Sequence, residues 1–487
     1  MQNLPVKLYT AEQVREMESI VIKENDIAGI ELMRRAGAAV FSVLKKCYKF
    51  NKLIVFCGSG NNAGDGYVIA KLALKSGYKV IVYSASIPKS LSGDALIAYE
   101  EYCDSGGLYD DQVDKPILTE CVIVDALLGT GLNRIVSGQY SEMIELINNS
   151  TCPVISVDIP SGLNADTGSA MGSVVKADKT VSFIGLKQGL LTGVAAEYCG
   201  EILYSPLDVA DEVFQRVNYA AKRIQQSYLP NRNRCAHKGH NGHVLVVGGD
   251  SGYSGATTIA AQAALRIGSG LVSVATRQIH SHFINNHQPE VMCHGVEDVT
   301  ELVALIEKAT VIVVGPGLGR SKWAQSIFST LLSINKPLII DADGLNLLAK
   351  QAIHHNNWIL TPHPGEAARL LDCSTADIAE DRFAAVSKLQ SKYGGVALLK
   401  GAGTLLSNGD EIFVSTTGNP GMASGGMGDL LSGMIAGLVA QKIDLMNAAT
   451  MAVYLHGKAA ELSAKQSGEI GMVATDLLPI IRQLINE

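Results

Sequence analysis

Short aliphatic runs alternate with segments of helical length along this chain, and this alternation constrains the fold more than any other feature. In the first half the aliphatic runs are residues 52–56, 79–83, 121–125, 153–158 and 180–183. Segments long enough for helices lie between them, at residues 63–76, 94–105 and 139–148. Continuously apolar strands that alternate with helices predict a mostly parallel, doubly wound sheet with helices on both faces.

The alternation stops between residues 206 and 240, where polar and basic residues collect at 231–242. All 11 histidines lie beyond residue 206, which marks a shift in composition. A second alternation then begins, with aliphatic runs at residues 243–250, 271–276, 310–314, 337–341, 358–361 and 396–400. Because 487 residues exceed what one core supports, we predict two α/β domains, residues 1–222 and 223–487.

The composition narrows the class of protein. A net charge of −7 argues against a nucleic-acid binder. The 9 cysteines contain no Cys-x-x-Cys pair, so they indicate neither a disulfide framework nor a zinc ribbon. No segment resembles a signal peptide and no apolar run is long enough to span a bilayer, so we expect a cytoplasmic protein without a membrane partner.

A glycine cluster near the C-terminus ends in one aspartate. Residues 419–437 read Asn-Pro-Gly-Met-Ala-Ser-Gly-Gly-Met-Gly-Asp-Leu-Leu-Ser-Gly-Met-Ile-Ala-Gly, so Asp429 stands between the glycines and an apolar segment of helical length. Glycines let successive N–H groups point inward, and the helix N-terminus adds partial positive charge, which together make an anion site. A carboxylate there suits a base that takes a proton from a hydroxyl about to accept a phosphoryl group. The segment therefore predicts phosphoryl transfer.

Polar and glycine-rich loops follow four aliphatic runs of the second half, at residues 315–319, 341–346, 361–369 and 400–404. Because ligands bind outside the carboxyl ends of parallel strands, we expect these loops to share one site with Asp429. Lys400 supplies a cation suited to a polyphosphate.

The spacing of His237, His240 and His243 raises the alternative of a metal site. No carboxylate or cysteine lies beside them, so solvated loop residues are the preferred interpretation over a zinc site.

The first half holds a second candidate site. Glycine-rich residues 57–66 follow the first aliphatic run, and Asp125 and Asp158 end two later runs. We expect Asn62, Asp125 and Ser161 to converge at the sheet edge, where oxygen ligands with one carboxylate suit a weakly charged cation such as potassium. The residue types leave equally open the alternative that Asp125 and Asp158 only cap the turns after their strands.

The ordered motifs resemble a known family. GSGNNAGDG, VDALLGTG and VDIPSGLNADTG resemble NAD(P)H-hydrate epimerase. HKGHNGHVLVVGG, GPGLG, DADGLN, TPHPGEAARLL, LLKGAGT and GNPGMASGGMGDLLSGMIAG resemble ADP/ATP-dependent NAD(P)H-hydrate dehydratase, of the ribokinase-like superfamily. Together they span nearly the whole chain, as in bifunctional NAD(P)H-hydrate repair enzymes. The resemblance implies a Rossmann-like three-layer sandwich for the N-terminal domain and a ribokinase-like C-terminal domain.

The implied reaction repairs reduced nicotinamide cofactors that have added water, the hydrates NADHX and NADPHX, each of which has an R and an S epimer. By this resemblance the C-terminal domain dehydrates the S hydrate with ADP or ATP. Asp429 deprotonates the ring hydroxyl, phosphorylation turns it into a better leaving group, phosphate is then eliminated, and Mg²⁺ screens the nucleotide phosphates. The implied nucleotide-binding residues are Lys400, Gly401, Ala402, Gly403, Thr404, Asn419, Pro420, Gly421, Met422, Ala423, Ser424, Gly425, Gly426, Met427 and Gly428. The implied hydrate-binding residues are Gly317, His363, Pro364, Gly365, Glu366, Ala367, Ala368, Arg369 and Asp429.

One residue of the anion site departs from the family's pattern. Met427 occupies a position that a small hydroxyl residue often fills. We expect the site to tolerate it, because backbone N–H groups do the binding.

By the same resemblance the N-terminal domain interconverts the two epimers. The implied substrate-binding residues are Asn61, Asn62, Ala63, Gly64, Asp65, Gly129, Thr130, Gly131, Leu132, Asn133, Arg134, Ile135 and Asp158. Asp158 is the candidate for acid–base catalysis, and Asn62, Asp125 and Ser161 are the candidate potassium ligands. Lys187 is a second catalytic candidate, although we expect it to be a solvated lysine.

Other functions stay open at this point. The C-terminal half also fits a kinase of a vitamin precursor or a sugar, which would leave the N-terminal half unexplained. A non-catalytic nucleotide sensor fits less well, because Asp429 would hinder phosphate binding. The N-terminal half also fits a protein-binding module. An oligomer of identical chains is expected by analogy with ribokinase-like proteins.

Overall fold

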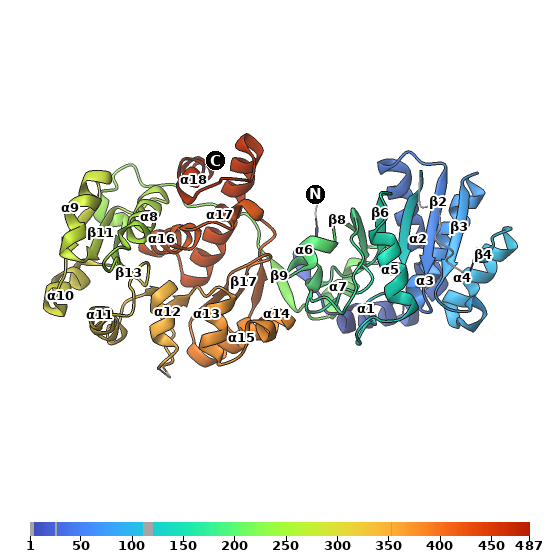
Figure 1. Ribbon diagram of the computed structural model, residues 1–487, viewed down its shortest axis with the longest axis horizontal. Helices are drawn as coiled ribbons and strands as arrows, with labels where there is room; N and C mark the ends of the chain where they lie inside the picture. Colours follow the sequence, from blue (N-terminus) through green and yellow to red (C-terminus); the bar gives the residue numbers. More distant parts are fainter. Residues whose placement is uncertain (1–3, 25–26, 111–119, 352) are drawn as a thin grey trace. The chain divides into compact units, whose positions relative to one another are not determined.

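The computed structural model describes residues 4–24, 27–110, 120–351 and 353–487, and Figure 1 shows its helices and strands. The chain divides into two compact units, Met1–Arg223 and Ile224–Glu487. No helix within the described ranges combines the length and the apolar character that a bilayer crossing requires.

The first unit contains a parallel sheet with the strand order β4-β3-β2-β5-β6-β7-β8. Its strands are β2 (Lys52–Cys57), β3 (Lys79–Ser84), β4 (Tyr109–Asp110), β5 (Val122–Ala126), β6 (Val154–Val157), β7 (Lys179–Phe183) and β8 (Glu201–Ser205). Its helices are α1 (Ala11–Glu24), α2 (Gly29–Cys47), α3 (Asn61–Lys75), α4 (Gly93–Asp104), α5 (Gln139–Asn148), α6 (Ala195–Tyr198) and α7 (Asp211–Arg216). A short antiparallel pair, β1 (Lys7–Leu8) with β9 (Ala221–Arg223), joins the two ends of this unit.

Strand β2 shows why the aliphatic runs are continuous. Leu53 and Val55 belong to the core cluster that also contains residues of α1 to α4. Ile54 and Phe56 belong to a second cluster, which contains residues of α5. Since neighbouring side chains of a strand point to opposite faces, both faces of this sheet are covered by helices. This confirms the predicted doubly wound α/β architecture, and the helices predicted at 63–76, 94–105 and 139–148 are found as α3, α4 and α5.

The second unit contains a longer sheet with the order β18-β17-β16-β15-β14-β13-β10-β11-β12. The strands are β10 (His243–Val247), β11 (Leu271–Thr276), β12 (Met292–Gly295), β13 (Val311–Val314), β14 (Leu338–Ile340), β15 (Trp358–Leu360), β16 (Val396–Leu399), β17 (Leu405–Ser407) and β18 (Ile412–Val414). From β12 to β16 neighbouring strands are parallel, whereas β16, β17 and β18 are antiparallel. The parallel part confirms the second predicted α/β pattern, and the sequence reasoning missed the antiparallel edge.

Helices cover both faces of the second sheet as well (Figure 1). They are α8 (Ser254–Arg266), α9 (Gln278–His287), α10 (Val299–Lys308), α11 (Lys322–Leu332), α12 (Ala342–Leu348), α13 (Pro364–Leu371), α14 (Thr375–Glu380), α15 (Arg382–Tyr393), α16 (Met427–Ala440), α17 (Leu445–Ser467) and α18 (Leu477–Leu484). Helix α16 packs so closely on α8 that a Cβ atom added at Gly433 would lie only 2.1 Å from the Ala260 carbonyl oxygen. This close packing fixes the helix whose N-terminus carries Asp429.

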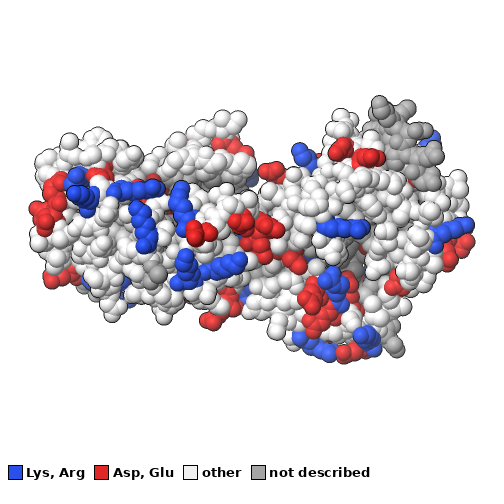
Figure 2. All heavy atoms as spheres, turned by 60° about the horizontal axis from the view of Figure 1, so that its bottom comes forward, with Lys and Arg blue, Asp and Glu red and all other residues white. Residues whose placement is uncertain are grey.

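Surface charge is mixed in sign. Figure 2 shows several Lys and Arg side chains side by side on one face of the second unit, although the whole chain carries a net charge of −7. A local basic group of this kind attracts small anions whatever the net charge of the chain.

Candidate active sites

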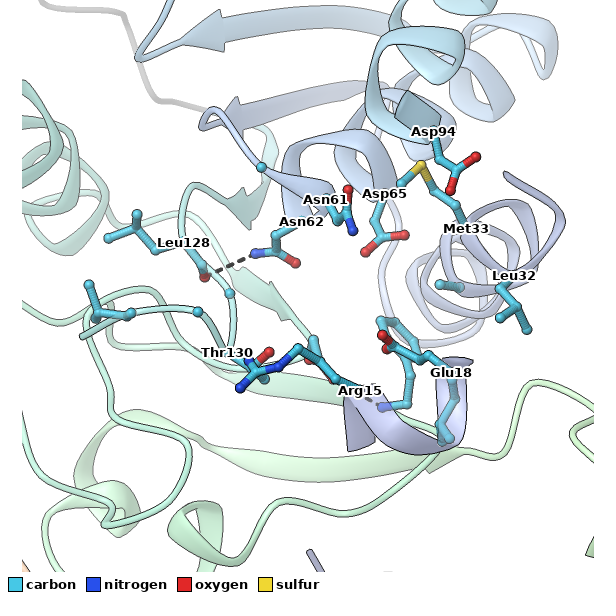
Figure 3. A pocket seen from close by; sticks show the side chains of 18 of the residues that line it. Arg15, Glu18, Leu32, Met33, Asn61, Asn62, Asp65, Asp94, Leu128 and Thr130 are labelled. Carbon is cyan, nitrogen blue, oxygen red and sulfur yellow. Dashed lines mark hydrogen bonds between the residues drawn. The ribbon is translucent and has the colours of Figure 1, made fainter. Parts of the chain in front are cut away.

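The first unit holds a cavity of about 540 Å³ at the carboxyl ends of its strands (Figure 3). The predicted residues that line it are Asn61, Asn62, Asp65, Gly129, Thr130, Gly131, Leu132, Asn133, Arg134 and Asp158. Ala63, Gly64 and Ile135 do not line it. Gly64 packs against α2 so closely that a Cβ atom there would lie 2.5 Å from the Met33 sulfur.

Asp125 is fully buried at the end of β5 and accepts four hydrogen bonds. They come from the Ser161 hydroxyl (2.5 Å), the Ser161 N–H (2.9 Å), the Ser156 hydroxyl (2.7 Å) and the Leu127 N–H (3.3 Å). Burial raises the pKa of the Asp125 carboxyl, and these hydrogen bonds oppose part of that rise. Two of the donors are backbone groups of the following turns, so Asp125 caps these turns.

Asn62 and Ser161 are joined to the same network through Leu128. The Asn62 amide donates to the Leu128 carbonyl oxygen at 3.0 Å, and the Leu128 N–H donates to the Ser161 hydroxyl oxygen at 2.8 Å. The Asn62 Oδ1 atom is buried without a hydrogen-bond partner. A buried oxygen without a donor is unusual unless a ligand supplies its partner. The predicted potassium ligands Asn62, Asp125 and Ser161 are thus brought together, and their oxygen-only donor set fits such a cation.

Asp158 follows β6 with a positive φ of 66°, a strained conformation for a residue other than glycine. Its Oδ1 atom forms an ion pair with Lys187 and accepts a hydrogen bond from the Phe183 N–H at 3.1 Å. The Asp158 side chain is 18% exposed and lines the cavity, so it is available to a ligand.

Lys187 corrects our expectation of a solvated lysine. Its side chain is only 1% exposed, and its ammonium group also donates to the Phe183 carbonyl oxygen at 3.0 Å. A lysine pays a large desolvation cost when it is buried, so the carboxylate and carbonyl partners explain its place. The sequence could not reveal this, because the carboxylate partner, Asp158, lies 29 residues away at the end of another strand.

Two further polar residues of the cavity, Arg15 and Glu18, come from α1 and were missed by the sequence reasoning. Nothing in the motif order places α1 near the strand ends, and only the amphipathic character of the helix hints that one face packs on the sheet.

In the second unit, residues 425–428 form the predicted anion site at the N-terminus of α16. Gly426 is the N-cap and has a φ of 91°, which favours glycine. The Met427 side chain is 5% exposed and packs in the core with Leu430 and Leu431. Because that side chain points away into the core, the departure from the family's pattern leaves the backbone N–H groups in place.

A buried ion cluster lies beside this anion site. The Lys400 ammonium donates to Asp341 Oδ1 at 2.9 Å and lies 4.0 Å from Glu366 Oε2. Asp341 Oδ2 accepts a hydrogen bond from the Ser432 hydroxyl of α16 at 2.5 Å. A Cβ atom at Gly428 would lie 3.2 Å from the Lys400 nitrogen, so the missing side chain lets the cation approach the helix terminus.

This cluster sets the protonation of the carboxyls. Burial raises the pKa of Asp429 to about 7, Asp341 and Glu366 add to the rise, and Lys400 opposes it. Burial also raises the pKa of Glu366 to about 7. Burial alone would raise the pKa of Asp341, but Lys400 and the Ser432 hydroxyl outweigh it, so that pKa is lowered. A carboxyl whose pKa lies near neutral pH, as that of Asp429 does, suits general-base catalysis.

The predicted nucleotide-binding segment contains unsatisfied polar atoms. The Asn419 Nδ2 and Ser424 Oγ atoms are buried without hydrogen-bond partners, as is His456 Nε2 on α17. The predicted loop 401–404 follows β16, and its Gly401 and Gly403 have φ values of 134° and 60°. Buried orphan donors beside a helix N-terminus are the groups that a phosphate-bearing ligand satisfies.

The predicted hydrate-binding residues come from the ends of β13 and β15. Gly317 has a φ of 57° and follows β13. His363 caps α13: its ring Nδ1 accepts a hydrogen bond from the Gly365 N–H at 3.0 Å, and its backbone N–H donates to the Glu366 carboxylate at 2.8 Å. Arg369 donates to Asn346 at 2.7 Å. Ala367 and Ala368 are buried in the core and offer no polar group, so their place at this site is structural.

The histidine group near residue 240 has a structural role. His237 and His240 form a capping box at a short helical turn, with ring centroids 3.6 Å apart. Within the described part of the chain, no group of three or more His, Cys, Asp or Glu side chains is arranged to hold a metal ion.

Comparisons with known proteins agree with this geometry. A family described as YjeF-related protein N-terminus matches residues 29–189, and one described as NAD(P)H-hydrate dehydratase matches residues 244–483. The bifunctional NAD(P)H-hydrate repair enzyme Nnr of Coxiella burnetii is 46% identical over 98% of this chain and 99% of its own length. The enzymes of the same name from Vibrio cholerae and Escherichia coli are 44% and 40% identical over 99% of this chain, and over 99% and 95% of their own lengths. The family predicted from the ordered motifs is confirmed: the chain belongs to the bifunctional NAD(P)H-hydrate repair enzymes.

Proposed function

We propose that this chain repairs hydrated NADH and NADPH, with residues 1–222 as the epimerase and residues 223–487 as the dehydratase. The observation that carries the proposal is the place of Asp429, which lies in the first turn of a helix with a glycine-rich N-terminus, close to the half-buried Lys400. A base next to an anion site is the arrangement that phosphorylation of a hydroxyl requires.

In the dehydratase, ADP or ATP is the co-substrate. Asp429 takes the proton of the ring hydroxyl, and the oxygen attacks the terminal phosphorus, which releases AMP from ADP or ADP from ATP. The N–H groups of residues 425–428 and the Lys400 ammonium stabilise the charge on the phosphoryl group. The ring nitrogen then donates its electron pair as phosphate leaves, and loss of a proton from the neighbouring carbon restores the double bond.

Bound Mg²⁺ would screen the nucleotide phosphates. Mg²⁺ sites commonly combine one or two carboxylates with phosphate oxygens, and Asp341 and Glu366 are the carboxylates beside the anion site. The donor set therefore fits a cation that is held mainly by the nucleotide.

In the epimerase, Asp158 exchanges protons with the substrate hydroxyl, and the members of residues 61–65 and 129–135 that line the cavity hold the dinucleotide. A potassium ion would be held by Asn62, Asp125 and Ser161, where it would satisfy the unpartnered Asn62 oxygen. Its contribution there is to neutralise charge and to fix the loop that carries Leu128.

The test uses purified full-length protein, Mg²⁺, ADP or ATP, and a mixed-epimer preparation of NADH hydrate. Recovery of the reduced-nicotinamide absorbance should be complete with the wild type, about half with Asp158→Asn, and absent with Asp429→Asn. No recovery with wild-type protein, together with phosphorylation of a vitamin precursor or a sugar, would replace this proposal with the kinase alternative.

The cytoplasmic location and the homo-oligomer are parts of the same proposal. Light scattering of the purified protein measures its oligomeric state. A monomer at all concentrations would contradict the proposed homo-oligomer.

A further inference from the structure

Three carboxyl groups that line the first unit's cavity, those of Glu18, Asp65 and Asp94, have no hydrogen bond or ion pair within the described residues, and two of them have a raised pKa. Glu18 on α1 and Asp65 on α3 both line it, and Figure 3 shows both side chains at the cavity. Among the residues that the structure describes, neither carboxyl accepts a hydrogen bond or forms an ion pair. Asp125 and Asp158, in contrast, are held by several donors each. Carboxyl groups that line a cavity and accept no hydrogen bond from the protein are available to a ligand.

A separate observation points to a ligand at the same place. Asn62 lines this cavity, is 8% exposed and presents its unpartnered Oδ1 atom. The cavity therefore contains more polar groups than its own walls satisfy.

The charges around the cavity favour a protonated Asp65. Burial raises the pKa of Asp65 well above its ordinary value, Asp158 and Glu18 add to the rise, and Lys187 opposes it. Burial also raises the pKa of Glu18, against Lys187 and Arg15. The charged residues that line the cavity are Arg15, Glu18, Asp65, Asp94, Arg134, Asp158 and Lys187.

Epimerisation needs a proton donor and a proton acceptor on opposite faces of the ring. The hydroxyl leaves from one face and returns on the other, so one carboxyl cannot serve both events. Asp158 follows β6, whereas Asp65 comes from α3, and both line the cavity.

We propose that Asp65 is a second catalytic residue of the first unit, the acid that protonates the departing hydroxyl, and that Glu18 is a positioning residue that acts through Asp65. The proposal rests on the epimerase function proposed above. Asp65 gives its proton to the hydroxyl oxygen, the carbon–oxygen bond breaks, water leaves, and the ring nitrogen's electron pair forms a C=N bond. Water then adds to the opposite face, the electron pair returns to nitrogen, and the Asp158 carboxylate takes the released proton. Proton exchange with solvent resets the pair, and the reverse reaction exchanges their roles.

The experiment uses the full-length protein with one purified epimer of NADH hydrate and no nucleotide, so that dehydration cannot consume the product. Chromatography follows the appearance of the other epimer from pH 5 to 10, with the rate without enzyme subtracted. Asp65→Asn should reduce kcat by about 100-fold or more, and Asp65→Glu should recover part of it because it keeps an acid. Glu18→Gln should move the alkaline limb of the pH profile to lower pH by less than about one unit, because one of the charges that raise the pKa of Asp65 is gone while burial and Asp158 remain.

Glu16→Gln is the matched control, since Glu16 is an exposed residue of α1 that does not line the cavity. It should leave both the rate and the profile unchanged. Because dehydration reports only on the second unit, urea denaturation of each variant shows whether the first unit is folded.

The possible failures are distinguishable. If the wild type does not interconvert the epimers, the proposed function is wrong. If the wild type does so and Asp65→Asn keeps the same rate and profile, the role of Asp65 is overturned. If Glu18→Gln lowers the rate with no shift of the alkaline limb, Glu18 does not act through Asp65.

Discussion

The two candidate sites occupy the same position in their folds and treat charge in opposite ways. Both lie at the carboxyl ends of parallel strands. In the second unit Lys400 lies between two of the carboxyls, those of Asp341 and Glu366. In the first unit Lys187 forms its ion pair with Asp158, whereas Glu18 and Asp65 face a cavity of about 540 Å³ without an ion pair of their own among the described residues. A site that handles phosphate needs a held cation, whereas one that moves protons needs carboxyls with different proton affinities.

The largest expected effect is the loss of dehydratase activity with epimerase activity unchanged. Asp429→Asn keeps the shape of the side chain but removes the base, so dehydratase kcat should fall by about 10³-fold. Epimerase activity should stay at the wild-type level, because Asp429 lies in the second unit. Steady-state assays of the two half-reactions measure both numbers, and a matching loss of epimerisation would show that the two activities are not separable.

The next effect is on stability. Lys187→Met leaves Asp158 without its cation in a buried position, which should cost about 3–5 kcal/mol of unfolding free energy and abolish epimerisation. Lys179→Met is the matched control in the same part of the chain, because the Lys179–Glu201 pair is partly exposed and should contribute only about 0–1 kcal/mol. Urea denaturation measures both values. Equal losses for the two variants would mean that burial of the Lys187 pair has no special cost.

A smaller effect concerns pH. Asp429 works as a base when it is deprotonated, so dehydratase kcat should rise with pH through about 7, where its pKa lies. The charge of Glu366 raises that pKa, so Glu366→Gln should move the acid limb to lower pH by less than about one unit. A pH series of kcat at saturating substrate checks the direction. An acid limb that moves upward would contradict the assignment of Asp429 as the base.

The smallest effect tests whether the anion site depends on backbone alone. Met427→Leu keeps an apolar side chain of similar volume in the core, so it should cost less than about 1.5 kcal/mol of stability. The KM for ADP or ATP should stay within about 2-fold of the wild type. A large rise in KM would show that the side chain takes part in binding.

The sequence predicted those structural features whose cause lies in neighbouring residues, and it missed those that depend on residues far away in the chain. The almost continuously apolar composition of residues 52–56 is enough to predict a strand that is buried on both faces, and these residues form β2 as predicted. Strands β17 and β18 were missed because their formation follows from antiparallel pairing with a neighbouring strand. Asp429 was found because the glycines that position it are adjacent in sequence. Glu18 was missed, and Lys187 was misjudged, because their surroundings come from elements far away in the chain.

The burial of Lys187 has a consequence for chemical labelling. Reagents that modify lysine amines need an accessible, neutral nitrogen, and a side chain that is 1% exposed and ion-paired offers neither in the folded protein. Surface lysines should react within minutes, whereas Lys187 should react only when the first unit opens. Its labelling rate, read by peptide mass, would therefore report how often that unit opens, and a bound substrate should slow the reaction further.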